Sequence, residues 1–201
     1  MPYLEWLASS TFVLVINKDK KMKFTTDRLI LRAWELSDAE DLFRYAKDEN
    51  IGPVAGWPAH TSVEESKSII ESVFSRPEIY AVAIKENNRA IGCIGLLIGE
   101  DSNFPISNKE GEVAYWLGVP FWGQGLIPEA LEVIIQHSFE TLELETLWCG
   151  FFEGNEKSKK AQEKCGFQHS HIVENQYNQF MNDYRVEYIS RLNRSDWKSR
   201  G

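Results

Sequence analysis

The sequence lacks long apolar runs and has few cysteines. No stretch approaches the roughly 20 apolar residues that a membrane-spanning helix requires, and no basic segment opens the chain as it would open a secretory signal peptide. The three cysteines, Cys93, Cys149 and Cys165, are an odd number without paired spacing, which argues against a disulfide framework or a zinc knuckle. These absences predict a cytoplasmic protein without a bound metal.

The chain has fewer positively charged than negatively charged side chains. The 201 residues include 22 Lys and Arg against 30 Asp and Glu, which gives a net charge of −8 and a pI of about 5.1. Such a molecule repels phosphate backbones, so broad nucleic-acid binding is not expected, and a cationic partner is modestly favoured. The 43% of hydrophobic and 26% of charged residues are typical of globular proteins and exclude a disordered or collagen-like chain.

Hydrophobic periodicity predicts one domain with the element order β-α-α-β-β-β-α-β-α-β-β. We expect strands at 28–33, 80–84, 90–97, 112–119, 146–151, 167–173 and 185–192, and helices at 37–46, 61–74, 128–139 and 155–165. The predicted fold class is α/β (α+β), with a mixed, mostly antiparallel central sheet of six to seven strands flanked by about four helices. A charged run at 17–21 separates a short apolar stretch at 12–16 from the first predicted strand. Residues 1–22 are therefore expected to form an N-terminal extension to the domain at 23–201.

The most informative segment lies between a predicted strand and a predicted helix and reads Trp122-Gly123-Gln124-Gly125-Leu126-Ile127-Pro128-Glu129-Ala130. Two glycines one residue apart permit a tight turn, and the N–H groups at a helix N-terminus attract anions. The segment is not a Walker A motif, because no Gly-Lys-Ser/Thr follows, and it lacks the third glycine of the dinucleotide fingerprint. The pattern indicates an anion-binding turn, although a plain strand-to-helix connection would also explain it.

A second pattern follows the next predicted strand. It consists of Asn155-Glu156-Lys157-Ser158 and then Glu163-Lys164-Cys165-Gly166-Phe167. Each residue alone fits the start or the end of a helix. Capping does not explain why this pattern follows the two-glycine turn on the adjacent β-α unit.

The two patterns together resemble the GNAT superfamily of N-acetyltransferases, in particular the branch that contains the ribosomal-protein acetyltransferases RimJ and RimL. The resemblance also rests on Thr26-x-Arg28-Leu29-x-Leu31-Arg32 and on Glu112-Val113-Ala114-Tyr115-Trp116-Leu117, and it covers about residues 23–192, with Ser195-Asp196-Trp197 similar to the tail of that branch. Ile127 departs from the Gly or Ala that many relatives carry.

The resemblance implies acetyl-CoA as the acetyl donor. The cofactor is expected on the turn that begins with Trp122 and Gly123, with its pyrophosphate on the backbone of Gln124, Gly125, Leu126 and Ile127. The pantetheine arm is expected along Leu117, Gly118 and Val119. Asn155 is expected to hydrogen-bond the pantetheine arm or a water near the acceptor. Ser158 is expected to contact CoA or to protonate the leaving thiolate. The family transfers the acetyl group by direct attack of an amine within a ternary complex.

The acceptor amine must lose a proton before it attacks, which calls for a base nearby. Glu112 opens the strand that leads to the cofactor turn and is the predicted base, with a strand-end carboxylate as the alternative. Trp57 is expected to contact the substrate, or else to anchor its Gly/Pro-rich loop. Glu129 falls inside a helix start and is expected to make a structural hydrogen bond or to serve the helix dipole.

Other chemistry-bearing residues receive structural interpretations. His169 and His171 share a strand face without a further ligand, and Cys149 and Cys165 are expected to pack in the core. Lys157, Lys159 and Lys160 are expected to form a solvated helix face, with contact to the CoA 3′-phosphate as the alternative.

The predicted function is acetyl-CoA-dependent N-acetylation of a primary amine, with a protein N-terminal α-amine as the leading acceptor. Two alternatives remain open, namely a small amine such as a polyamine, amino sugar or antibiotic, and a non-catalytic acyl-CoA-binding module. The expected partners are acetyl-CoA and the amine acceptor, without nucleic acid or membrane, and the protein is expected to be a monomer or a homodimer.

Overall fold

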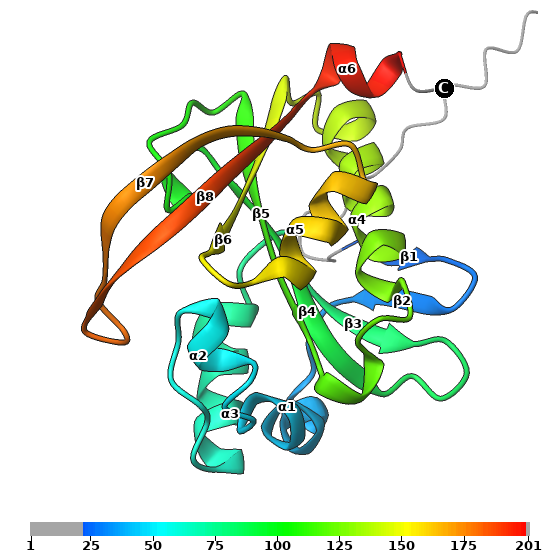
Figure 1. The fold of residues 1–201 in the computed structure, drawn as a ribbon. Coiled ribbons are helices and arrows are strands. Elements are labelled where there is room, and N and C mark those ends of the chain that lie inside the picture. The colour runs from blue at the N-terminus through cyan, green and yellow to red at the C-terminus, as the bar shows by residue number, and fades with distance from the viewer. Residues whose placement is uncertain (1–21, 200–201) are drawn as a thin grey trace, which may run out of the picture.

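A computed structural model describes residues 22–199, which build one eight-stranded sheet with helices on both faces (Figure 1). The strands are β1 (Phe24–Thr25), β2 (Leu29–Arg32), β3 (Ile79–Ile84), β4 (Ala90–Ile98), β5 (Glu110–Leu117), β6 (Thr146–Phe152), β7 (Gln168–Asn178) and β8 (Asp183–Asn193). Their order in the sheet is β1-β2-β3-β4-β5-β6-β8-β7. Only the β5–β6 pair is parallel, so the mixed, mostly antiparallel sheet predicted from the sequence is confirmed.

The structure contains more strands and helices than the sequence predicted, and the additional ones are too short to be predicted. Within residues 22–199, eight strands replace the expected six to seven, and six helices replace about four. The elements not foreseen are β1, with two residues, α2 (Gly52–Ala55) and α6 (Arg194–Lys198). Segments of two to five residues are too short to show a hydrophobic period. Pro53 fits the first turn of α2, and Gly56, with φ of 93°, ends it.

Two hydrophobic clusters fix the helices on opposite faces of the sheet. On one face, α4 (Leu126–Gln136) is buried along most of its length, and α5 (Glu156–Lys164) packs beside it. On the other face, α1 (Ala39–Ala46) and α3 (Val63–Ile69) cover the sheet beside α2. The central strands are apolar on both sides, as sheets covered on two faces require.

The sheet divides between its two central parallel strands. β5 and β6 are paired at only three positions, Glu110 with Thr146, Gly111 with Leu147 and Glu112 with Trp148. Beyond Glu112, β5 stays paired with β4 and β6 stays paired with β8, while β5 and β6 no longer pair with each other. The two strands therefore diverge after Glu112, and backbone groups along the diverging edges are available to a ligand.

The predicted N-terminal extension lies outside the described residues. Among residues 22–199, no helix combines the length and the apolar composition needed to cross a bilayer. All three cysteines are buried thiols, and for Cys149 and Cys165 this burial agrees with the predicted packing role.

We expect deletion of residues 1–21 to leave the domain intact, because the sheet and both core clusters are formed by residues after 21. The melting temperature should change by less than about 2 °C and the Kd for acetyl-CoA by less than about twofold. Differential scanning calorimetry and titration calorimetry measure both. A fall of the melting temperature by more than about 5 °C would show that the segment belongs to the folded unit.

Candidate active site

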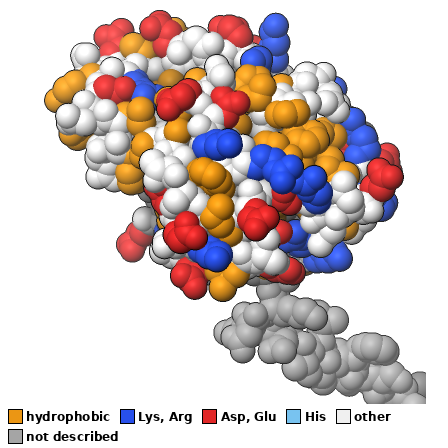
Figure 2. Space-filling view, turned by 90° about the horizontal axis from the view of Figure 1, so that it is seen from below, with side chains coloured by type: hydrophobic (Ala, Val, Ile, Leu, Met, Phe, Trp, Pro, Cys, Tyr) orange, Lys and Arg blue, Asp and Glu red, His pale blue; other side chains and the backbone are white. Residues whose placement is uncertain are grey.

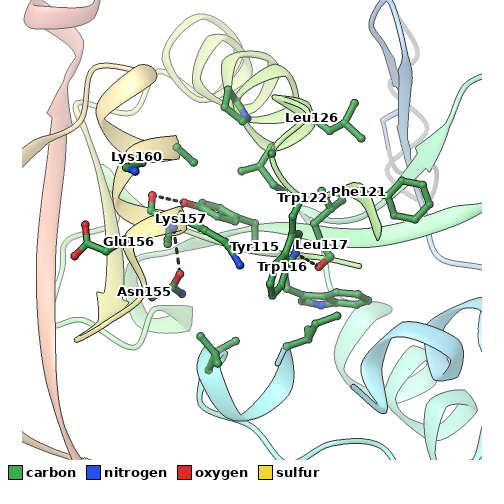
Figure 3. A pocket seen from close by; sticks show the side chains of 18 of the residues that line it. Tyr115, Trp116, Leu117, Phe121, Trp122, Leu126, Asn155, Glu156, Lys157 and Lys160 are labelled. Atoms are coloured by element: carbon green, nitrogen blue, oxygen red, sulfur yellow. Dashed lines mark hydrogen bonds between the residues drawn. The ribbon is translucent and has the colours of Figure 1, made fainter. Parts of the chain in front are cut away.

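A cavity of about 600 Å³ opens where β5 and β6 diverge (Figure 3). Its wall combines the end of β5, the two-glycine turn, the start of α4, the side of α5 and part of α2. Apolar side chains and lysines share the lining, and the face seen in Figure 2 likewise shows Lys and Arg side chains beside hydrophobic ones. A long, partly apolar ligand with an anionic end fits such a lining.

The two-glycine turn has the geometry of an anion site. Gly123 and Gly125 both have φ of 74°, and Gly125 is the N-cap of α4. Arg28 donates a hydrogen bond of 2.9 Å from Nη1 to the carbonyl of Gln124. A Cβ at Gly125 would lie 3.8 Å from Arg28 Nη2 and 3.9 Å from Lys164 Nζ. Unpaired N–H groups of the first helical turn and two cations therefore converge on the same point.

Glu129 holds this turn against the start of the sheet. Its carboxylate accepts hydrogen bonds from Thr26 Oγ1, from the Arg28 backbone N–H at 3.0 Å and from Arg28 Nε at 2.7 Å. Burial would raise the pKa of Glu129, but the hydrogen bonds from Thr26 and Arg28 outweigh it and lower that pKa. The structural hydrogen bond predicted for Glu129 is confirmed.

The predicted cofactor residues separate into two groups. The residues that line the cavity are Leu117, Trp122, Gly123, Gly125, Leu126, Ile127, Asn155 and Ser158. Gly118, Val119 and Gln124 lie next to it in the chain without lining it. The Trp122 indole donates to the Leu117 carbonyl at 2.7 Å, and Lys157 Nζ stands 3.6 Å from the Trp122 ring centre, so this indole is fixed on both sides.

Three lysines of α5 line the cavity, whereas the sequence analysis expected the lysines of this helix to face solvent. Lys157, Lys160 and Lys164 line it, whereas Lys159 does not. The three positions share one helix face, because they are spaced by three and four residues. A negatively charged ligand would therefore meet three ammonium groups along one wall.

A hydrogen-bond chain crosses the gap between β5 and α5. Tyr115 OH is hydrogen-bonded to Ser158 Oγ at 2.9 Å, and Ser158 Oγ also accepts from Gln162 Nε2 at 3.1 Å. Asn155 Oδ1 accepts from the Ser158 backbone N–H at 3.2 Å and so caps α5 (Figure 3). Burial raises the pKa of Tyr115 above its ordinary value, so its hydroxyl keeps its proton at neutral pH. Sequence analysis missed Tyr115, although strand alternation places it on the same face as Leu117.

Two glutamates meet on the other face of the sheet, where the strands begin to diverge. Glu112 is buried, and its carboxylate accepts from Ser102 Oγ at 2.8 Å, from the Asn103 backbone N–H at 2.7 Å and from Asn103 Nδ2 at 3.1 Å. Glu187, on β8, was not foreseen. Burial, with the charge of Glu112 as the second cause, raises the pKa of Glu187 to about 7.

The remaining candidates have structural contacts. Trp57 packs against Trp116, with ring centres 5.9 Å apart, and against His60, at 5.5 Å, and it is not part of the cavity lining. These contacts anchor its loop. On β7, His171 lies beside the ring of Trp148 on β6, and His169 lies beside the ring of Tyr188 on β8. In the described part of the chain, no group of three or more His, Cys, Asp or Glu side chains could hold a metal ion.

Comparison with known proteins decides the family. Residues 28–168 match the family model described as an acetyltransferase (GNAT) domain. The chain belongs to the GNAT family of acetyltransferases. It is 27% identical over 148 residues to an uncharacterized N-acetyltransferase p20 of Bacillus licheniformis, which covers 71% of this chain and 80% of that protein.

Solved structures agree with this GNAT fold. A ribosomal-protein-S5-alanine acetyltransferase from Vibrio fischeri superimposes with a TM-score of 0.66 at 21% identity, covering 88% of this chain and 99% of that one. The microcin C7 self immunity acetyltransferase MccE, solved with acetyl-CoA and AMP, gives a TM-score of 0.67 at 21% identity, covering 84% and 93%. Both structures therefore share the GNAT fold with this chain.

The GNAT family uses acetyl-CoA, and the residues of this chain fit it. The two-glycine turn, Arg28 and the α5 lysines suit its phosphates, and the diverging edge of β5 suits the amide groups of its pantetheine arm. The protein is therefore an acetyl-CoA-dependent N-acetyltransferase.

Proposed function

We propose that the acceptor is the α-amine of a protein N-terminus. The observation that carries this proposal is the side of the divergence opposite α4 and α5, where Glu112 and Glu187 place two carboxyl groups next to the cavity without lining it. Acidic groups attract an ammonium group, and the net charge of −8 draws cations toward the molecule. The amine is expected to enter from this side and acetyl-CoA from the other, as a ternary complex requires.

A polypeptide suits the rim of this entrance. The β7–β8 hairpin contacts the α2 loop through Arg185 Nη1, which donates to the Pro53 carbonyl at 2.6 Å, and Asn178 Nδ2, which donates to the Gly56 carbonyl at 2.9 Å. Beyond these contacts, the hairpin exposes Phe180 and Tyr184, which are 67% and 71% exposed. Exposed aromatic side chains beside a polar entrance favour a peptide over a small amine. The S5-alanine acetyltransferase from Vibrio fischeri supports the same choice by its name.

The residues around the cavity divide the chemistry between two faces. Acetyl-CoA supplies the acetyl thioester. We assign the carboxyl face to removal of the amine proton, and the Tyr115–Ser158 face to protonation of the departing sulfur. Asn155 holds the Ser158 backbone in place and is assigned to the pantetheine arm or a water near the acceptor. The backbone N–H groups at Gly125, Leu126 and Ile127 are assigned to the pyrophosphate.

Acetylation of a peptide panel tests this function. We expect acetyl-CoA and short peptides with free Ala, Ser, Thr or Met N-termini to give a product heavier by one acetyl group at the α-amine, located by tandem mass spectrometry. Matched peptides with a blocked α-amine and one free lysine should remain unmodified. Acetylation of spermidine or glucosamine without any peptide product would assign a small amine, and acetyl-CoA binding without any product would indicate a binding module.

Assembly and location remain predictions. A monomer or a homodimer is expected in light scattering, and cytoplasmic protein is expected on cell fractionation.

A further inference from the structure

Strand register brings Glu112 and Glu187 to the same face of the sheet. Glu112 pairs with Trp148 across β5–β6, and Glu187 pairs with Phe152 across β6–β8. Trp148, Gly150 and Phe152 alternate along β6 and therefore point to one face. Both glutamates lie on that face, one on each side of β6, at the point where β5 and β6 stop pairing.

Gly150 allows the Glu187 carboxyl to approach β5. A Cβ at this position would overlap Oε1 of Glu187 and would lie 3.1 Å from the ring of Phe104. Because glycine has no side chain, the Glu187 carboxyl lies over the β6 backbone, and its pKa is affected by the charge of Glu112. Phe104 covers the same site from the loop that also carries the hydrogen-bond donors to Glu112.

The two carboxyl groups differ in their hydrogen bonds. Glu112 accepts from Ser102 and from two groups of Asn103, so most of its acceptor sites are occupied and its position is fixed. Across residues 22–199, no group donates a hydrogen bond to Glu187 and no cation pairs with it within 4.0 Å. The nearby Arg185 is bound to Asp183, at 2.8 Å, and to the Pro53 carbonyl instead. Glu187 thus presents the free carboxyl of the pair.

We propose that Glu187 takes the proton from the acceptor ammonium, and that Glu112 is a positioning residue beside it. This inference rests on the proposed acetylation of an amine at this site. It moves the proton-accepting role from Glu112 to a residue on another strand and keeps Glu112 within the site. A carboxyl group without a donor has all its acceptor sites available to the ammonium group, whereas three donors already occupy most of those of Glu112.

The charges around Glu187 agree with this role. Burial, followed by the negative charge of Glu112, raises the pKa of Glu187 to about 7. Cys149 on β6 is the other titratable neighbour, and burial raises its pKa well above the ordinary value, so the thiol stays neutral. On β7, His171 contacts the Trp148 ring and is hydrogen-bonded through Nδ1 to Ser170 Oγ. A base whose pKa lies near the working pH transfers protons efficiently in both directions.

The proton step is simple. One N–H bond of the acceptor ammonium breaks, its electron pair remains on nitrogen, and an O–H bond forms on Glu187. The neutral amine is then the nucleophile, and Glu187 returns its proton to water before the next turnover. No oxidant, reductant or metal takes part.

A titration tests the pair without any acceptor. With ¹³C-labelled glutamate side chains, the carboxyl resonance that disappears in Glu187→Gln should titrate with a midpoint near pH 7 in the wild type. In Glu112→Gln, the same resonance should titrate at lower pH, because the neighbouring negative charge is gone. A Glu187 midpoint close to the ordinary value of about 4.5, or one unaffected by Glu112→Gln, would overturn the pairing.

Kinetics test the role in catalysis. At pH 7.5, Glu187→Gln should lower kcat/KM for the acceptor about 10²–10³-fold while the Kd for acetyl-CoA changes less than about threefold. The increase of kcat/KM with pH through about 7 should be absent in this variant. Glu174→Gln, which removes the same charge from an exposed position of β7, is the matched control and should behave as the wild type.

Two further variants separate Glu187 from Glu112. Gly150→Ala displaces the Glu187 carboxyl without changing its chemistry, and it should lower kcat/KM at least about tenfold. Glu112→Gln should shift the pH-dependent increase to lower pH, whereas it would abolish that increase if Glu112 itself took the proton. Near-wild-type turnover of Glu187→Gln with an unchanged pH profile would overturn the inference.

The experiments distinguish failure of the proposed peptide acceptor from failure of the role proposed for Glu187. If peptides are not acetylated but spermidine is, the pH profiles are measured with spermidine, and the assignment of Glu187 is decided on that substrate. If no amine reacts, the catalytic assignment is overturned even where the titration confirms the carboxyl pair.

Discussion

Substitution of Gly125 by valine is expected to raise the Kd for acetyl-CoA by about 10²-fold or more. The backbone at Gly125 has φ of 74°, a conformation that a β-branched residue avoids, and its Cβ would point toward the space between Arg28 Nη2 and Lys164 Nζ. A valine there would occupy the position assigned to the pyrophosphate and distort the first N–H groups of α4. Isothermal titration calorimetry measures the affinity.

A second variant, with similar backbone strain at a position away from the cavity, controls for a loss of stability. Gly166 has φ of 85° at the end of α5 and does not line the cavity, so Gly166→Val introduces similar backbone strain without entering the site. Both variants should melt at lower temperature than the wild type, but only Gly125→Val should lose affinity. Unchanged affinity in a folded Gly125→Val protein would remove the turn from the cofactor site.

Substitution of Ser158 by alanine is expected to lower kcat about 10²-fold with little change in the Kd for acetyl-CoA. The hydroxyl is hydrogen-bonded to Tyr115 OH and accepts from Gln162 Nε2, so it is held at the cavity wall, where the proposed protonation of the departing sulfur would need it. The Ser158 backbone N–H would still donate to Asn155 Oδ1, which keeps the helix cap intact. Steady-state kinetics with saturating acetyl-CoA and a reactive peptide measure the effect.

Ser68→Ala is the matched control for this variant. Ser68 lies on α3, where its hydroxyl donates only to the Glu64 carbonyl of the preceding turn. Its turnover should equal that of the wild type. If Ser158→Ala also keeps the wild-type kcat, the proton donor is Tyr115 or water rather than Ser158. The kcat of a Tyr115→Phe variant then decides between these two.

The residues assigned to the cofactor could be singled out from the sequence because they lie in short, local segments. The turn at 122–127 joins a strand to a helix, and its glycines, helix start and flanking strand all lie within one short segment. Asn155 and Ser158 are likewise adjacent to their helix start, so capping chemistry identifies their positions. Local patterns of this kind determine backbone geometry directly.

The residues proposed for the acceptor side could not all be predicted, because the placement of Glu187 depends on the register between distant strands. Glu187 reaches Glu112 only through the pairing of β8 with β6 and the absence of a side chain at Gly150. Bulges in the β7–β8 pairing, between His169 and His171 and between Val173 and Gln176, shift the hairpin by single residues. A shift of one residue reverses the face to which a side chain points, so alternation alone does not assign it.

Trp57 shows the same dependence on tertiary contacts. Its place in a Gly/Pro-rich loop was compatible with either substrate contact or anchoring. Only the packing of its ring against Trp116 and over Gly52 favours anchoring. Substrate contact by Trp57 stays a prediction that acceptor kinetics of a Trp57→Phe variant would test.

A crystal structure with bound CoA tests the central claim most directly, namely that the divergence of β5 and β6 is the active site. The account predicts the pyrophosphate on the N–H groups of Gly125, Leu126 and Ile127, with the pantetheine arm along the end of β5. It also predicts the sulfur within hydrogen-bond reach of the Ser158 hydroxyl. CoA bound elsewhere, or with its sulfur directed away from both Ser158 and Glu187, would contradict the account.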